Sequence, residues 1–226
     1  MDVTAALRRR AIVLEIGGFP PPVDPLASWF GRVTVYRPGE EWPTADGAPM
    51  HALCQINLAE LPFRPPRMDD VAMITLFIGP RGLPSHTPNG GGWCLRAYRD
   101  LSELKVVEPL ETDSGIRPFP MRPTVVEDDF PCWEDLPIDL PDDVSDRYHD
   151  LYHNVPGMKL GGWPTLVQSQ IFWAPWNKHP AAPEYVFQVD SSEKAGWSWG
   201  HDGVGYLGRG TAPGKEDEWA LDWQCL

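Results

Sequence analysis

The stretch GWSWGHDGVGYLG, residues 196–208, contains two familiar functional patterns side by side. GWSWG fits G-x-S-x-G, the nucleophile elbow of serine hydrolases, and GVGYLG fits G-x-G-x-x-G, the dinucleotide-binding fingerprint. Neither pattern has the context that its chemistry needs, because glycines and a short β-like run follow Ser198, and only 18 residues follow Gly208. We therefore predict a turn-rich β-hairpin, in which Asp202-Gly203 forms a turn and the glycines let tryptophan rings pack closely.

The sequence on either side of this stretch favours a fold built from short strands. Twenty-six prolines and 21 glycines interrupt the chain too often for long helices. Runs rich in β-branched and aromatic residues predict strands at residues 32–36, 50–58, 71–78, 93–98, 104–110, 165–173, 184–190 and 204–207. Helices are predicted only over the first dozen residues and over 142–153. The expected fold class is mainly β, a β-rich α+β arrangement with few peripheral helices.

The length of 226 residues suits a single domain, residues 1–226, that can bury a sizeable core. Two β-rich halves, about 30–110 and 155–226, each contain an apolar run that ends in Gln-apolar-Asn or Gln-apolar-Asp. We interpret them as a loosely duplicated β unit. The segment 124–146 has nine Asp or Glu residues and neither Lys nor Arg, and we expect it to be an acidic connection between the halves.

The composition excludes several classes of protein. A formal net charge of −13 argues against nucleic-acid binding, which requires clustered Lys and Arg. No apolar run approaches the ~20 residues of a membrane span, and Glu15 interrupts the apolar patch near the N-terminus, so we expect no membrane association and a cytoplasmic protein. The four cysteines lie far apart without a C-x-x-C motif, which predicts reduced thiols rather than a zinc site.

Two further patterns need interpretation. His149 and His153 have the i, i+4 spacing of helical metal ligands, but the H-E-x-x-H motif would need Glu where Asp150 stands, and no further ligand has a diagnostic spacing. We therefore predict no metal and no cofactor. Trp173 and Trp176 flank a proline and are the best candidates for exposed aromatic side chains.

One set of motifs is specific when taken together: Gly47, Pro49 and LCQINLAELP (53–62) in the first half, and Gly162, Pro164, Gln168, FQVDSS, WGHDG and Trp223–Cys225 in the second. In these residues the chain resembles the YwqG-like family, a bacterial domain of unknown function. Arg32 departs from the usual paired glycines, and His201 stands at a position that is usually acidic. The resemblance implies a roll-like, mainly β domain, and similarity to proteins encoded near toxin genes implies a role in immunity.

Our leading hypothesis is a non-catalytic protein-binding domain of the immunity type, which binds and neutralises a basic toxin domain. A negatively charged surface with an apolar anchor suits such a partner. The predicted partner-binding residues are Glu127, Asp128, Asp129, Trp133, Glu134 and Asp135.

The alternative hypothesis is a small-ligand-binding protein or hydrolase-like enzyme that uses a cleft between the two halves. It would require polar groups from both halves to converge in one pocket. The candidate cleft residues are Gln55, Asn57, Gln188, Asp190, Ser198, His201 and Asp202.

Overall fold

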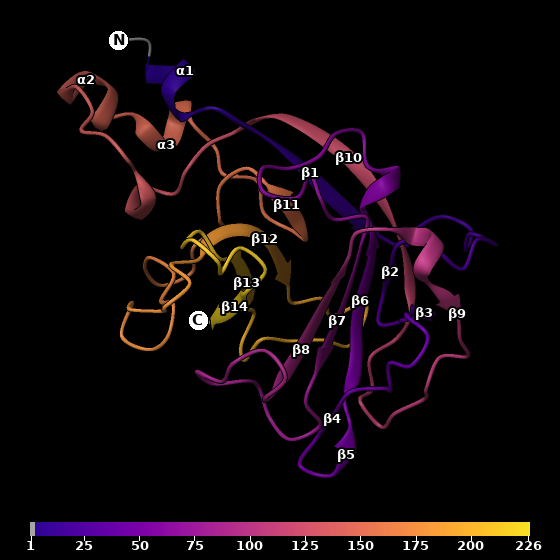
Figure 1. The fold of residues 1–226 in the computed structure, drawn as a ribbon. Coiled ribbons are helices and arrows are strands. Elements are labelled where there is room, and N and C mark those ends of the chain that lie inside the picture. The colour runs from indigo at the N-terminus through magenta and orange to yellow at the C-terminus, as the bar shows by residue number, and fades with distance from the viewer. Residues whose placement is uncertain (1–2) are drawn as a thin grey trace.

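A computed structural model of the chain describes residues 3–226, and its main feature is a ten-stranded antiparallel sheet that nearly closes on itself (Figure 1). The strand order in this sheet is β14-β13-β12-β11-β1-β10-β2-β6-β7-β8. The strands are β1 (Arg9–Ile16), β2 (Trp29–Phe30), β6 (His51–Asn57), β7 (Met73–Ile78), β8 (Trp93–Tyr98), β10 (Phe119–Asp129), β11 (Lys159–Gly161), β12 (Glu184–Asp190), β13 (Val204–Arg209) and β14 (Trp219–Gln224). The mainly β, roll-like fold class is confirmed.

The remaining elements are short. Two small ladders pair β3 (Val35–Tyr36) with β9 (Lys105–Val106), and β4 (Thr44–Ala45) with β5 (Ala48–Pro49). The helices are α1 (Val3–Leu7), α2 (Asp142–Ser145) and α3 (Tyr148–Leu151), with 3-10 turns η1 (Leu58–Glu60), η2 (Leu101–Glu103) and η3 (Trp133–Asp135). None of the helices between residues 3 and 226 is long and apolar enough to cross a membrane.

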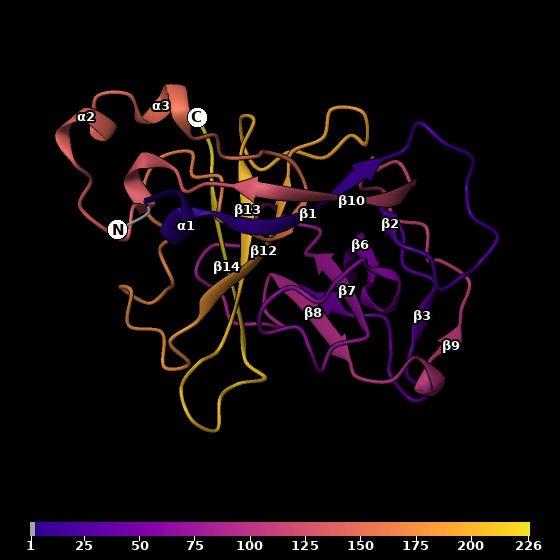
Figure 2. The ribbon, with the colours of Figure 1, turned by 90° about the horizontal axis from the view of Figure 1, so that it is seen from above.

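The two halves of the chain exchange their first strands. β2, β6, β7 and β8 form one side of the sheet, and β11 to β14 form the other. β1 precedes the first half in the sequence but pairs with β11, whereas β10 precedes the second half but pairs with β2. β1 and β10 pair with each other at the centre (Figure 2). Each half therefore depends on a strand from the other, and they share one sheet.

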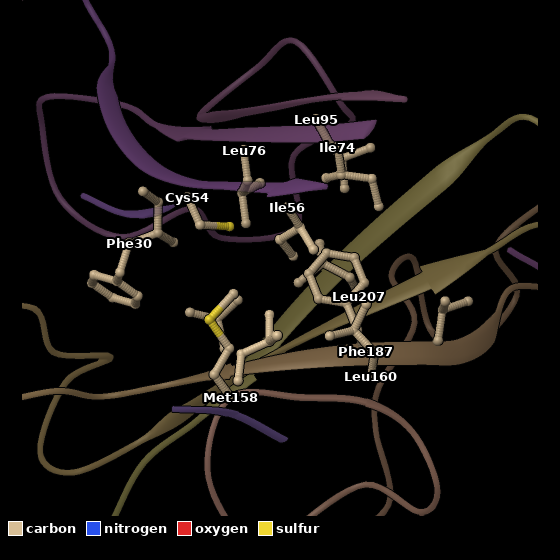
Figure 3. Close-up of a cluster of buried hydrophobic side chains, with 14 of the residues drawn as sticks. Phe30, Cys54, Ile56, Ile74, Leu76, Leu95, Met158, Leu160, Phe187 and Leu207 are labelled. Atoms are coloured by element: carbon tan, nitrogen blue, oxygen red, sulfur yellow. The ribbon is translucent and has the colours of Figure 1, made fainter. Parts of the chain in front are cut away.

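The concave face of the sheet contains the main hydrophobic core. Side chains from both halves meet there because alternate residues of each strand point to the same face. Figure 3 labels Phe30, Cys54, Ile56, Ile74, Leu76, Leu95, Met158, Leu160, Phe187 and Leu207. All of them are at most 4% exposed. The halves are therefore joined in two ways, by the exchanged strands and by burial of this shared apolar surface.

The edge strands β8 and β14 approach each other at the seam where the sheet does not close. Ionic contacts cross the seam, because Arg209 on β13 binds Asp70 of the first half, and Arg99 of the first half binds Asp217 at 2.8 Å. A cavity of about 390 Å³ lies behind them and is lined by Leu95 of β8 and Trp219 of β14, among others. A further cavity, of about 280 Å³, also lies between the halves and is lined by Trp93 of β8 and Leu221 of β14, among others.

Gln55 and Gln188 occupy corresponding positions on the convex face. Gln55 lies opposite Trp29 of β2, and Gln188 lies opposite Lys159 of β11. Both are fully buried, and each side-chain oxygen accepts a hydrogen bond from a threonine amide, of Thr34 at 2.9 Å and Thr165 at 2.8 Å. The Gln55 amide nitrogen donates to two carbonyls and that of Gln188 to one carbonyl and a carboxylate, so each glutamine fixes a loop over its strand.

The stretch 196–208 forms the loop and second strand of a hairpin, as predicted. β12 and β13 are antiparallel neighbours, and residues 191–203 connect them. Asp202 has a φ of 48°, which suits a turn. A side chain at Gly205 would overlap the ring of Trp199, which is fully buried, so this glycine of the fingerprint pattern makes room for a tryptophan.

Several elements differ from the sequence-based prediction. Residues 9–12, the end of the expected N-terminal helix, instead belong to β1, because RRAIVLEI places apolar side chains on both faces of the strand, as a central strand requires. Residues 124–129, expected to begin the acidic connection, belong to β10, since Arg8 and Arg10 compensate two of its charges. Residues 165–173 are not a strand, because their backbone bonds to the side chains of Gln188, Gln224 and Asp222 instead of to another strand.

Three more differences concern short elements. The predicted helix over 142–153 is two four-residue helices, α2 and α3. The strands β11 and β14 were not predicted. The predicted strands 32–36 and 104–110 each contain only a two-residue strand. Prolines at 109 and 118 and the polar residues between them account for the shortened second strand.

Replacing Gln55 with leucine tests the structural role of the buried glutamines. The Gln55→Leu change leaves the amide of Thr34 and the carbonyl of Ala27 without partners and removes one of the two donors to the Pro25 carbonyl, so we expect a loss of about 3 kcal/mol in the free energy of unfolding. Urea denaturation followed by tryptophan fluorescence would measure this loss. Gln170→Leu, at an exposed position, is the control. Equal stability of the two variants would contradict the assigned role.

Candidate functional site

Residues 130–154 leave the sheet at the end of β10 and carry η3, α2 and α3; we call this segment the acidic excursion. Figures 1 and 2 both show its helices beside α1, beyond the ends of β1 and β10. The base of the excursion is closed by hydrogen bonds between its two ends. The amide of Phe130 donates to the His153 carbonyl at 3.2 Å, and the Asn154 side chain donates to the Phe130 carbonyl at 2.9 Å.

A buried ion pair anchors this base. Asp129, the last residue of β10, is fully buried and accepts hydrogen bonds from the amides of Val155 and Trp163 and from Lys159 Nζ at 3.0 Å. Lys159 is also fully buried and donates to the Val155 carbonyl at 2.6 Å. Burial lowers the pKa of Lys159, and the Asp129 carboxylate opposes this shift. Charged groups at such a depth remain stable only when they are paired in this way.

The excursion has a small hydrophobic core of its own. Phe130 and Tyr148 pack with Leu7 of α1, and the Tyr148 hydroxyl donates to the Pro131 carbonyl at 2.8 Å. Trp163 Nε1 donates to the Leu7 carbonyl, which holds α1 against the excursion. The core therefore fixes the outer residues of the excursion relative to the sheet.

A groove of about 600 Å³ runs along the outer side of the excursion. It is lined by Trp133, Leu136, Pro137, Ile138, Asp139, Leu140 and Ser145. Trp133 is 42% exposed, although its ring contacts that of Tyr148 edge-on, with 5.6 Å between the ring centroids. An exposed tryptophan that is held by a neighbouring ring presents apolar area at little cost in conformational entropy.

In the described part of the chain, several acidic residues close in the sequence to those that line the groove have no ion-pair partner. The exposed acids of the excursion are Glu134, Asp139, Asp142, Asp143, Asp146 and Asp150. Within residues 3–226, none of these six carboxylates forms an ion pair. Arg147 is the single Lys or Arg of the excursion. The groove thus combines an exposed tryptophan and partly buried apolar side chains with Asp139 in its lining and five further acids close by in the sequence, which favours a positively charged ligand.

The six predicted partner-binding residues occupy three different environments. Trp133 and Glu134 are exposed at the groove. Glu127 and Asp128 are exposed on β10 but are paired with Arg10 at 2.8 Å and Arg8 at 3.5 Å.

Asp135 and Asp129 are the less accessible members of the predicted set. Asp135 is partly buried, and burial raises its pKa while Arg9 opposes the shift. Asp129 is fully buried in its ion pair with Lys159, so its side chain cannot contact a partner; the sequence pattern EDD did not reveal that the strand ends there. The apolar lining of the groove was missed, although leucine and isoleucine between the prolines of LPIDLP gave a signal.

The seven predicted cleft residues do not converge. Gln55 and Asn57 lie on β6, Gln188 and Asp190 lie on β12, and four strands of the sheet separate β6 from β12. Among these residues, Gln188 and Asp190 are hydrogen-bonded to each other at 2.9 Å. The Asn57 side chain accepts from the Ala59 amide.

The other three cleft candidates lie on the β12–β13 loop. The Ser198 hydroxyl donates to the Gly200 carbonyl, and His201 and Asp202 are exposed. Burial raises the pKa of Asp190, but the Gly157 amide and Gln188 occupy its two oxygens. None of the seven residues lines the cavity at the seam between the halves.

The remaining sequence candidates are placed as follows. No group of three His, Cys, Asp or Glu side chains that could hold a metal ion occurs in residues 3–226. His149 contacts the Trp133 ring, and His153 lies beyond the end of α3. Trp176 is 81% exposed, whereas the ring of Trp173 packs over Gly208.

Comparison with known proteins gave one match. A family model described as "Domain of unknown function (DUF1963)" matches residues 28–208, and the YwqG-like family carries this domain. The match includes both buried glutamines and the acidic excursion. No curated protein matches the chain.

Asp129→Asn tests whether the buried ion pair anchors the excursion. The variant leaves the Lys159 ammonium buried without a carboxylate, so we expect it to lower the free energy of unfolding by about 3–5 kcal/mol. Asp128→Asn is a matched control at the adjacent position, where the exposed pair with Arg8 contributes less than about 1 kcal/mol. Hydrogen exchange should also increase in residues 130–154 of the Asp129 variant first. Unchanged exchange there would rule out an anchoring role.

Proposed function

The chain belongs to the DUF1963 family, and we propose that it is a non-catalytic protein-binding domain that docks a basic segment of a partner protein in the groove of its acidic excursion. The partner that fits best is a toxin with a basic domain, which the bound protein would mask. The role would therefore be of the immunity type.

The observation that carries this proposal is the combination of apolar lining and negative charge at one rigid site. Trp133 and the leucine and isoleucine side chains provide apolar area for a partner side chain. The acids around them are unpaired, so their charge is available to a partner. Complementary charge of this kind accelerates association, whereas a buried aromatic anchor slows dissociation.

The alternative, an enzyme or small-ligand protein that uses the seven cleft residues, has no comparable support. Four of those residues lie on β6 and β12, which four other strands separate, and three lie on a loop; most are satisfied by the protein itself. A protein that neutralises another protein needs a stable, complementary surface rather than reactive groups. The buried ion pair and the hydrogen bonds at the base of the excursion hold it in place, which meets that need.

Co-expression with the product of the neighbouring gene tests the immunity proposal. We expect the neighbour to inhibit growth of the host when expressed alone, and this protein to restore growth and to co-elute with the neighbour in size-exclusion chromatography. A neighbour that is harmless, or that does not associate with this protein, would refute the immunity role.

Variants of the groove test the docking site itself. We expect Trp133→Ala to weaken partner binding by about 2 kcal/mol, mainly through faster dissociation. Combined Glu134→Gln, Asp139→Asn and Asp142→Asn changes should slow association and reduce its dependence on salt. Both effects can be measured by surface plasmon resonance.

The matched control replaces Glu127 and Asp128 with Gln and Asn. Because Arg8 and Arg10 already compensate these two charges, we expect a smaller effect on association than the groove variants produce. A larger effect from the β10 pair than from the groove residues would move the docking site to the strand.

A further inference from the structure

The cavity of about 280 Å³ between the halves lies next to an exposed tryptophan. The loop that joins β7 to β8, the segment 174–180 and β14 line this cavity, and its apolar walls include Pro88, Trp93, Pro175, Pro180, Trp219 and Leu221. Its volume is below the ~300–1,000 Å³ of small-molecule sites, so it suits a single large side chain. The cavity shares no lining residue with the groove of the acidic excursion.

Trp176 projects from the segment that forms one wall of the cavity. It is 81% exposed and does not line the cavity, although Ala174 and Pro175 do. An indole in this position leaves a large apolar area in water, and tryptophan is enriched among the side chains that anchor protein interfaces. The protein therefore presents an apolar side chain beside an apolar hole that this side chain does not fill.

The backbone holds Trp176 outward at a conformational cost. Trp176 and Asn177 have φ values of 54° and 52°, in the left-handed region, which is unfavourable for a tryptophan. Asn177 Oδ1 accepts a hydrogen bond from the Trp173 amide at 2.7 Å, and the Lys178 amide donates to the Pro175 carbonyl at 2.8 Å. Because these contacts fix the turn, little further entropy would be lost when the indole is buried in a complex.

The segments around the cavity carry little negative charge. The two longest stretches without Asp or Glu are 71–99 and 151–183, in a chain with a formal net charge of −13. They supply the two loop segments that line the cavity. Among the described residues of the lining, Glu218 is the single acid, and Lys215 pairs with it at 2.7 Å. A second molecule of this acidic protein would meet less repulsion here than at the acidic excursion.

We propose that two copies of this chain associate through this face, with Trp176 of each copy inserted in the cavity of the other. A projecting side chain beside a hole is self-complementary under two-fold symmetry, because the same contact then forms twice. The inserted indole would meet the proline and tryptophan side chains of the cavity walls. Each copy thus supplies one anchor and one pocket.

Analytical ultracentrifugation of the full chain tests the proposal. We expect the wild-type protein to form a reversible dimer with a dissociation constant in the micromolar range. Association should strengthen with added salt, because salt screens the repulsion between two chains of net charge −13. Trp176→Ala should raise the dissociation constant about a hundredfold or more, because the anchor is lost from both copies. Val23→Ala, at another exposed apolar position, should leave it unchanged.

Two results would overturn the proposal. One is a wild-type protein that remains monomeric up to about 500 µM. The other is a dimer whose dissociation constant does not change in Trp176→Ala.

A mixture of two variants tests the insertion itself. Pro88→Glu, at an exposed position in the cavity wall, should weaken self-association because it places a charge where the indole would be buried. In a mixture with Trp176→Ala, the intact Trp176 of the Pro88→Glu chain can enter the intact cavity of the other variant. We therefore expect the mixture to associate at least tenfold more tightly than either variant alone. Misfolding of a variant cannot produce this rescue, and its absence would show that Trp176 does not enter the cavity.

Discussion

The buried ion pair between Asp129 and Lys159 is the constraint on which the proposed docking surface depends. Its carboxylate holds the amides of Val155 and Trp163, so one side chain joins the end of β10 to both the return of the excursion and the segment that follows β11. A chain segment of this length with only a small core would otherwise be loosely attached. Because the pair is fully buried and saturated with hydrogen bonds, it defines where the excursion begins and ends.

The two halves use the same plan for different purposes. In both, a glutamine on the second strand of the half fixes a loop, and a glycine of positive φ, Gly31 or Gly161, stands at the start of that loop. The next residue differs between the halves. Gly162 leaves room for the Asp129 carboxylate of the buried ion pair, whereas the first half has Arg32, whose guanidinium lies over the Trp29 ring.

Much of the fold could be predicted from the sequence, since the alternation of β6, β7, β8, β12 and β13 and the turn residues between them are local signals. β1 and β10 were missed for opposite reasons. β1 is apolar on both faces and follows a short helix, whereas β10 contains prolines and charges whose partners are remote, such as Glu127, which pairs with Arg10. The adjacent acids of β10 illustrate the limit. Glu127 and Asp128 are exposed and paired with arginines, whereas Asp129 is buried with Lys159, and no local signal in the sequence distinguishes them.

The seam between β8 and β14 has a consequence for solubility. Edge strands expose unpaired backbone groups, which can recruit a strand from another molecule and start aggregation. Here the links from Arg209 to Asp70 and from Arg99 to Asp217 bridge the two edges of a single sheet. They place charged side chains beside both edges, and charge at an edge disfavours pairing with an incoming strand. The contacts that hold the seam together would thereby also keep the protein dispersed at high concentration.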